Sequence, residues 1–194
     1  MLMFYFSPGS SSMAPHIALH EIGVPFESRA LSSAKKEHRL PEFRAINPEG
    51  KVPTLVLEDG STLTEVAGIL YYLARRFPDA KLLPSGDIEA EAQIVSWMSF
   101  IAATLHPARG RGLEYANAVY AFAERRLGAH EWAIGSYSIA DIHLFRLYRR
   151  FVASLKPATG TFPNLDAHYD RMMKREAVKR TIEIESRIGY ELPE

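Results

Sequence analysis

The first part of the chain combines short apolar runs with a helical repeat. Leu2–Phe6 is apolar throughout and is bounded by Ser-Pro-Gly, which fits a buried strand. Helical spacing follows at Ala14, Ile17, Ala18 and Ile22. Gly23 then supplies a helix stop, and Phe26–Leu31 alternates apolar and polar residues like a half-buried strand. We therefore expect a strand, a helix and a second strand, in that order.

A hairpin and another helix are expected next. Val52–Leu57 and Ser61–Leu63 flank an Asp-Gly pair, which is typical of a tight hairpin turn. One apolar stripe of helical period then runs through Val66, Ile69, Leu70, Leu73 and Phe77. This stripe stops at Pro78, which cannot continue a helix.

Beyond this point the pattern changes to helical periods alone. Residues 79–86 contain proline and glycine and show no period, so we place an interdomain linker there. Three later apolar faces have helical spacing, and they begin at Ile94, Val119 and Ile142. The pattern predicts an α+β domain over residues 1–78 and an all-α domain over residues 87–194.

Charge and cysteine content narrow the function classes. Lys plus Arg and Asp plus Glu both number 23, so the formal net charge is zero and no long-range field attracts nucleic acid or anionic lipid. The chain has no cysteine, which excludes disulfides, thiolate metal sites and a cysteine nucleophile. The apolar start lacks a basic leader and is too short for a membrane span. We expect a cytoplasmic protein with no nucleic-acid or membrane partner.

Several polar residues are candidates for chemistry. Ser10, Ser11 and Ser12 directly precede the first predicted helix, whose N-terminus favours anionic atoms; the alternative is that they only cap the helix and form a turn. Ser138 and Asp141 have the spacing of a capping box. His16 and His20 share a helix face, but no third ligand can be named, so we expect no metal site.

The motifs together resemble a known family. In order along the chain, they are SPGSSSMAPHIALHE, NPEGKVPTL, LTEVAGILYYLARRFP, SIADI and FPNLDAHYDRMMKREAVKR. This series is similar to cytosolic glutathione S-transferases and is closest to the bacterial beta class. The resemblance implies a thioredoxin-like domain, then an all-helical domain that contributes an electrophile pocket. It also implies a cytoplasmic homodimer with a role in detoxification and glutathione as co-substrate.

The resemblance assigns binding roles to residues of the first domain. Most X-Pro bonds are trans, but Pro53 matches the cis-proline of the family, and the backbone of Val52 would then pair with the cysteinyl unit of glutathione. Glu65 would hold the γ-glutamyl ammonium, and the helix start at Val66 would receive the γ-glutamyl carboxylate. Lys35 or Lys36 would meet the glycyl carboxylate; plain solvated surface is the alternative for both lysines.

The thiol-facing residues depart from the beta class. That class normally has cysteine at the position of Ser11, so disulfide exchange is doubtful, whereas a hydroxyl can still stabilise a thiolate. Ser11 is the first candidate for this role and Ser12 the second. His106 matches a histidine near the thiol, with a helix-terminal histidine as the alternative. We expect Tyr5 to pack in the core.

The function implied is conjugation of the glutathione thiolate to a small apolar electrophile. Two departures bear on it: Val66 lacks the hydroxyl that the family commonly has there, and the stretch between His106 and Ser138 is short. A glutathione-dependent isomerase or dehalogenase, and a non-catalytic binding or regulatory protein, remain alternatives. The electrophile cannot be read from the sequence.

Overall fold

The computed structural model describes residues 1–84 and 86–191, and the chain divides into two units. The first unit is Met1–Phe77 with Glu176–Glu194, and the second is Pro78–Arg175. The predicted helical domain spans residues 87–194, whereas the second unit ends at Arg175. The difference arises because the last helix of the chain belongs to the first unit. Residue 85 of the predicted linker 79–86, and residues 192–194, lie outside the described part.

The first unit contains a four-stranded mixed sheet in the order β2-β1-β3-β4. Its strands are β1 (Leu2–Phe6), β2 (Phe26–Ala30), β3 (Thr54–Val56) and β4 (Thr62–Thr64). β1 runs parallel to β2 and antiparallel to β3, and β3 is antiparallel to β4. The sequence predicted all four strands, and the Asp-Gly hairpin joins β3 to β4.

The first unit also contains helices. They are α1 (Met13–Ile22), α2 (Pro41–Arg44), α3 (Val66–Arg76) and α9 (Glu176–Ile188), with a 3₁₀ turn η1 (Glu37–Arg39) before α2. Helix α1 ends as predicted at Gly23, which has a φ of 75° and donates its N–H to the carbonyl of Leu19 at 3.0 Å. The sequence did not predict η1 and α2, because two such short elements contain too few residues for a helical period to show.

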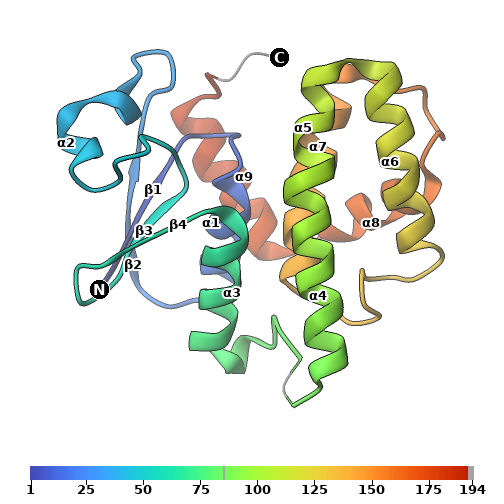
Figure 1. Ribbon diagram of the computed structural model, residues 1–194, viewed down its shortest axis with the longest axis horizontal. Coiled ribbons are helices and arrows are strands. Elements are labelled where there is room, and N and C mark those ends of the chain that lie inside the picture. Colours follow the sequence, from blue (N-terminus) through green and yellow to red (C-terminus); the bar gives the residue numbers. More distant parts are fainter. Residues whose placement is uncertain (85, 192–194) are drawn as a thin grey trace. The chain divides into compact units, whose positions relative to one another are not determined.

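The two faces of the sheet carry different helices, because side chains alternate along a strand. The rings of Phe4 and Phe6 lie 5.5 and 4.7 Å from that of His16 on α1. Between them in sequence, Tyr5 contacts Phe43 of α2 at 5.4 Å. Helix α1, which also packs on α3 and α9, therefore covers one face, and α2 lies over the other (Figure 1).

Among the described residues of the second unit, every regular secondary-structure element is a helix or a helical turn. Its elements are η2 (Pro78–Ala80), α4 (Ile88–Phe100), a π-helical turn η3 (Ile101–Leu105), α5 (His106–Ala108), η4 (Arg109–Arg111), α6 (Leu113–Leu127), α7 (Ile139–Leu155) and α8 (Pro163–Met173). In its core, Tyr120 stacks on Phe151 with 4.0 Å between the ring centroids. The indole N–H of Trp97 donates to the carbonyl of Ala133 at 2.9 Å. The predicted all-helical second half is confirmed.

The capping box at the start of α7 is also confirmed. Oδ2 of Asp141 accepts the N–H of Ser138 at 2.9 Å, and the Ser138 hydroxyl accepts the N–H of Ala140. The buried Asp141 does more than cap the helix. Its Oδ1 accepts the N–H of Ala133 at 2.8 Å and lies 3.1 Å from Nε2 of His168 on α8. One carboxylate thus joins a loop and two helices.

None of the helices in residues 1–84 and 86–191 has both the length and the hydropathy that a membrane-spanning segment needs.

Candidate functional site

The predicted site residues of the first unit meet at one end of the sheet. Thr54 at the start of β3 pairs with Tyr5 near the end of β1 and with Thr64 at the end of β4. The serine loop, which we define as Ser7–Ser12, follows β1. Pro53 precedes Thr54, and Glu65 follows Thr64. The antiparallel pairing therefore brings the serine loop, Pro53 and Glu65 to the same end of the sheet.

Within the serine loop, Ser12 has a structural role. Its hydroxyl is buried, accepts the N–H of Ser7 at 3.1 Å and donates to the carbonyl of Ser7 at 3.1 Å. It also lies 2.5 Å from the hydroxyl of Ser10. These partners use the full hydrogen-bonding capacity of the Ser12 hydroxyl. The hydroxyl therefore stabilises the conformation of the serine loop.

Ser11 is different. It is half-buried and stands two residues before the first residue of α1. Within residues 1–84 and 86–191, its hydroxyl has no hydrogen-bond partner. Of the two predicted serines, Ser11 therefore has a hydroxyl available to a ligand, at a helix N-terminus where negative charge is stabilised.

The Val52–Pro53 peptide bond is cis, as the family resemblance implied. Val52 is half-buried, and its N–H and C=O have no partner in the part of the chain that the structure describes. Such free groups at the start of a strand suit pairing with an extended peptide.

Buried Asn47 fixes the loop that carries Val52. Its amide donates to the carbonyl of Lys51 at 2.9 Å and to the hydroxyl of Thr54 at 3.0 Å, and its Oδ1 accepts the N–H of Glu49 at 3.1 Å. Sequence reasoning missed this residue. The Asn-Pro-Glu-Gly turn was the available signal, because Asn side chains commonly bond to nearby backbone in turns.

Glu65 caps α3 with an unusual backbone. Its φ is 65° and its ψ 130°, a combination that non-glycine residues rarely adopt and that clusters at active sites and ligand-binding loops. Its side chain is exposed. The first N–H groups of α3, beginning with Val66, have no partner within the helix. The Val66 side chain itself is buried.

Lys35 and Lys36 are exposed on the loop after β2. The N–H of Lys35 donates to the hydroxyl of Ser32 at 3.0 Å. The carboxylate of Glu191 accepts from the same hydroxyl at 2.7 Å and from the N–H of Ala34 at 3.1 Å. These bonds, above all that from Ser32, lower the pKa of Glu191, and the charge of Lys35 contributes. Lys35 therefore already lies beside one carboxylate.

A buried carboxylate on α9 supports the serine loop from behind. Oε2 of Glu185 accepts the N–H of Gly9 at 2.7 Å, and Oε1 lies 2.9 Å from Nδ1 of His16. Sequence reasoning missed Glu185, because no local pattern links residues so far apart in the chain.

The histidine pair on α1 is the other feature of this region. Burial, followed by the charges of His16 and Arg180, lowers the pKa of His20 to about 4. No group of three metal-ligating side chains is found among the described residues.

Comparison with known proteins decides the family. Residues 10–76 match the family "Glutathione S-transferase, N-terminal domain", and residues 91–176 match "Glutathione S-transferase, C-terminal domain". The chain belongs to the glutathione S-transferase family. The resemblance, the fold and the enzyme class predicted from sequence are thereby confirmed.

Individual relatives of this transferase agree. Glutathione S-transferase GstA of Escherichia coli O157:H7 is 31% identical, over 95% of this chain and 98% of the relative. A glutathione transferase homologue from Sulfitobacter, solved with bound glutathione, is 30% identical with a TM-score of 0.88, covering 95% of this chain and 98% of its own. A beta class enzyme from Sphingomonas chungbukensis is 32% identical with a TM-score of 0.81, covering 94% and 98%.

His106 of this transferase belongs to the second unit, whereas Ser11, Val52, Pro53 and Glu65 belong to the first. It follows the π-helical turn η3, and such turns occur frequently at functional sites. Desolvation, then the charges of Arg146 and Arg109, lower the pKa of His106. The lowered pKa favours the neutral imidazole at pH 7.

Proposed function

We propose that this glutathione S-transferase binds glutathione at the end of the sheet where the serine loop, Val52 and Glu65 lie. The observation that carries the proposal is the free hydroxyl of Ser11 at the start of α1, with the Ser12 hydroxyl used inside the loop. This hydroxyl would donate to the glutathione sulfur. Both the hydrogen bond and the helix N-terminus favour the thiolate over the thiol.

The remaining groups would hold the tripeptide. The free backbone of Val52 would pair with the cysteinyl unit, as one strand adds to another. The Glu65 carboxylate would hold the γ-glutamyl ammonium, and the N–H groups at the start of α3 would hold its carboxylate. Lys35 would meet the glycyl carboxylate. Since Val66 adds no hydroxyl, one hydrogen bond to the γ-glutamyl carboxylate, worth about 1 to 2 kcal/mol, is missing.

The reaction would join the sulfur to a small, largely apolar electrophile. The thiolate attacks an electrophilic carbon, the new C–S bond forms, and the leaving group departs with its electron pair. With an activated alkene, the sulfur adds and the adjacent carbanion takes a proton from water. His106 would polarise the sulfur or assist proton transfer.

We also propose that the protein is a cytoplasmic homodimer that detoxifies such electrophiles. Exposed apolar side chains on α4 and α6, among them Val95 and Phe122, support an assembly through the helical unit. Sedimentation equilibrium tests the dimer directly. We expect twice the mass of the chain, and the mass of a single chain would contradict the dimer.

The binding site is tested by calorimetric titration with glutathione. Glu65→Gln should raise the dissociation constant at least about tenfold, because a charge-assisted contact is lost. Glu58→Gln, an exposed change on the hairpin, should leave it unchanged. Equal affinities for Glu65→Gln and the parent would refute the assignment. Binding without turnover of an activated chloronitrobenzene would favour the non-catalytic alternative.

A further inference from the structure

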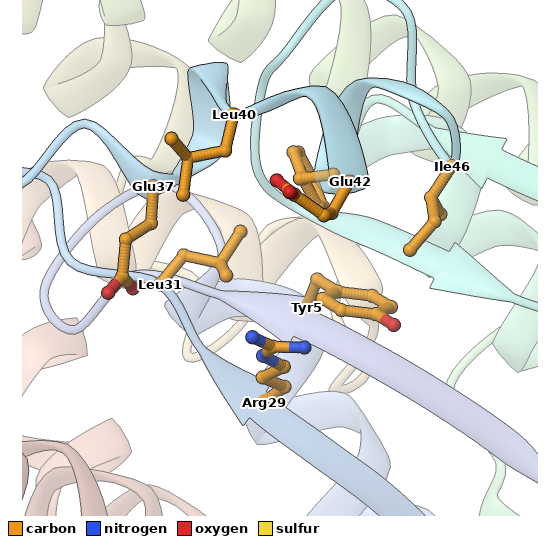
Figure 2. Close-up of a pocket in the computed structure, with 8 residues that line it drawn as sticks. Tyr5, Arg29, Leu31, Glu37, Leu40, Glu42 and Ile46 are labelled. Carbon is orange, nitrogen blue, oxygen red and sulfur yellow. The ribbon is translucent and has the colours of Figure 1, made fainter.

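A hollow of about 270 Å³ lies on the face of the sheet opposite α1. Figure 2 shows Tyr5, Arg29 and Leu31 on the sheet side of the hollow, and Leu40, Glu42 and Ile46 on the opposite side, in and beside α2. None of Ser11, Val52 and Glu65 lines it, so it is separate from the proposed glutathione site.

The sequence explains why this face is left open. Tyr5 points away from α1, since its neighbours Phe4 and Phe6 contact His16. The cover on this side is short, because α2 spans only Pro41–Arg44. The rings of Tyr5 and Phe43 contact each other, and both residues line the hollow with Leu31, Leu40 and Ile46, so most of the lining is apolar.

Two opposite charges flank this apolar cavity. Arg29 extends from β2, and Glu42 extends from α2 on the other side of the hollow in Figure 2. Within residues 1–84 and 86–191, neither side chain has an ion pair or a hydrogen bond. Glu37 also lines the hollow, but its carboxylate accepts the N–H of Ser32 at 2.8 Å. A cation and an anion thus remain available to a ligand.

We propose that this hollow binds a small amphipathic zwitterion with an apolar or aromatic body, of the class of the apolar α-amino acids. Its carboxylate would accept paired N–H bonds from the planar guanidinium of Arg29. Its ammonium would meet the carboxylate of Glu42, and its body would cover Tyr5, Leu31 and Ile46. The volume lies just below the usual range for drug-sized ligands, which suits a molecule of this size.

The test uses four probes of one shape and different charge: phenylalanine, 3-phenylpropanoate, 2-phenylethylamine and 2-phenylethanol. Binding to the full-length protein is followed by ligand-observed NMR titration. We expect phenylalanine to bind in the millimolar range and each probe that lacks one charge to bind about tenfold more weakly. Equal affinity for all four probes, or binding of 3-phenylpropanoate as tight as that of phenylalanine, would overturn the proposal.

Matched variants locate the site. Arg29→Gln and Glu42→Gln should each weaken phenylalanine binding about tenfold, while the exposed changes Arg39→Gln and Glu27→Gln outside the hollow should not. Thermal unfolding should be alike for all four, since these side chains are exposed. Saturating glutathione should leave phenylalanine binding unchanged; competition between them would place the amino acid in the glutathione site and defeat the proposal.

Discussion

The N–H of Gly9 donates to the buried carboxylate of Glu185 at 2.7 Å, across nearly the whole length of the chain. The ring of Tyr190 lies against the same glycine, where an added Cβ would come within 2.8 Å of Cδ1. Gly9 also has a φ of 74°, which an L side chain rarely adopts. Together with the packing of α9 on α1, these contacts explain why the C-terminal segment groups with the first unit.

Removing the Glu185 carboxylate should be strongly destabilising. Glu185→Ala leaves the Gly9 N–H and His16 without their partner in a buried setting, which we expect to cost about 3 to 5 kcal/mol of the free energy of unfolding. Glu185→Gln keeps an acceptor and the side-chain volume, so it should cost less. Urea unfolding measures both, and a loss below about 1 kcal/mol in the alanine variant would contradict this role.

The adjacent serines should differ in their effect on stability. Ser12→Ala leaves the N–H and carbonyl of Ser7 without their hydroxyl partner inside the loop, at a cost of about 1 to 3 kcal/mol. Ser11→Ala removes a hydroxyl without a protein partner, so the free energy of unfolding should change by less than about 0.5 kcal/mol. Similar losses in the two variants would show that the Ser11 hydroxyl is also structural.

Asp141 should matter more than an ordinary helix cap. Ser138→Ala removes one capping hydroxyl and should cost about 1 kcal/mol. Asp141→Ala strips partners from Ser138, Ala133 and His168 together, so several kcal/mol should be lost. Thermal and urea unfolding of the two variants compare them, and equal costs would mean that the links to Ala133 and α8 contribute nothing.

Buried His143 on α7 should make the protein sensitive to acid. Burial, then Arg146 and His106, lower its pKa to about 3 from an ordinary value of 6.5. Between these values the unfolded state binds the proton and the folded state does not, so stability falls as the pH drops below 6.5. At pH 4 the loss approaches about 3 kcal/mol.

His143→Leu removes this titration with similar volume. Unfolding in urea at pH 7 and pH 4 should show a smaller difference between the two pH values for the variant than for the parent. An identical acid dependence would contradict the contribution of His143.

The sequence was sufficient for features whose determinants are local. The spacing of apolar residues, together with residues that end helices or form turns, predicted β1, α1, the hairpin and α3. Gly23, Pro78 and the Asp-Gly pair determine the backbone only within a few residues of themselves. The capping box of Ser138 and Asp141 was found in the same way. The short α2 could not be found, since its place depends on Phe43 packing against Tyr5 of a strand.

The candidate site was only partly predictable. Family resemblance supplied Ser11, Val52, Pro53 and Glu65, but the hydrogen bonds that commit the Ser12 hydroxyl to Ser7 appear only in three dimensions. The partnership of Gly9 with Glu185 likewise depends on tertiary packing, which no local period records.

The thiol pKa of glutathione bound to the protein is the most direct test of the account. It is obtained from the ultraviolet absorbance of the thiolate in the binary complex as the pH is varied. The parent protein and Ser12→Ala, where it folds, should both bring this pKa well below that of free glutathione, whereas Ser11→Ala should bind glutathione and raise the pKa toward the free value. A thiol pKa in Ser11→Ala equal to that in the parent would contradict the central claim that the Ser11 hydroxyl stabilises the thiolate.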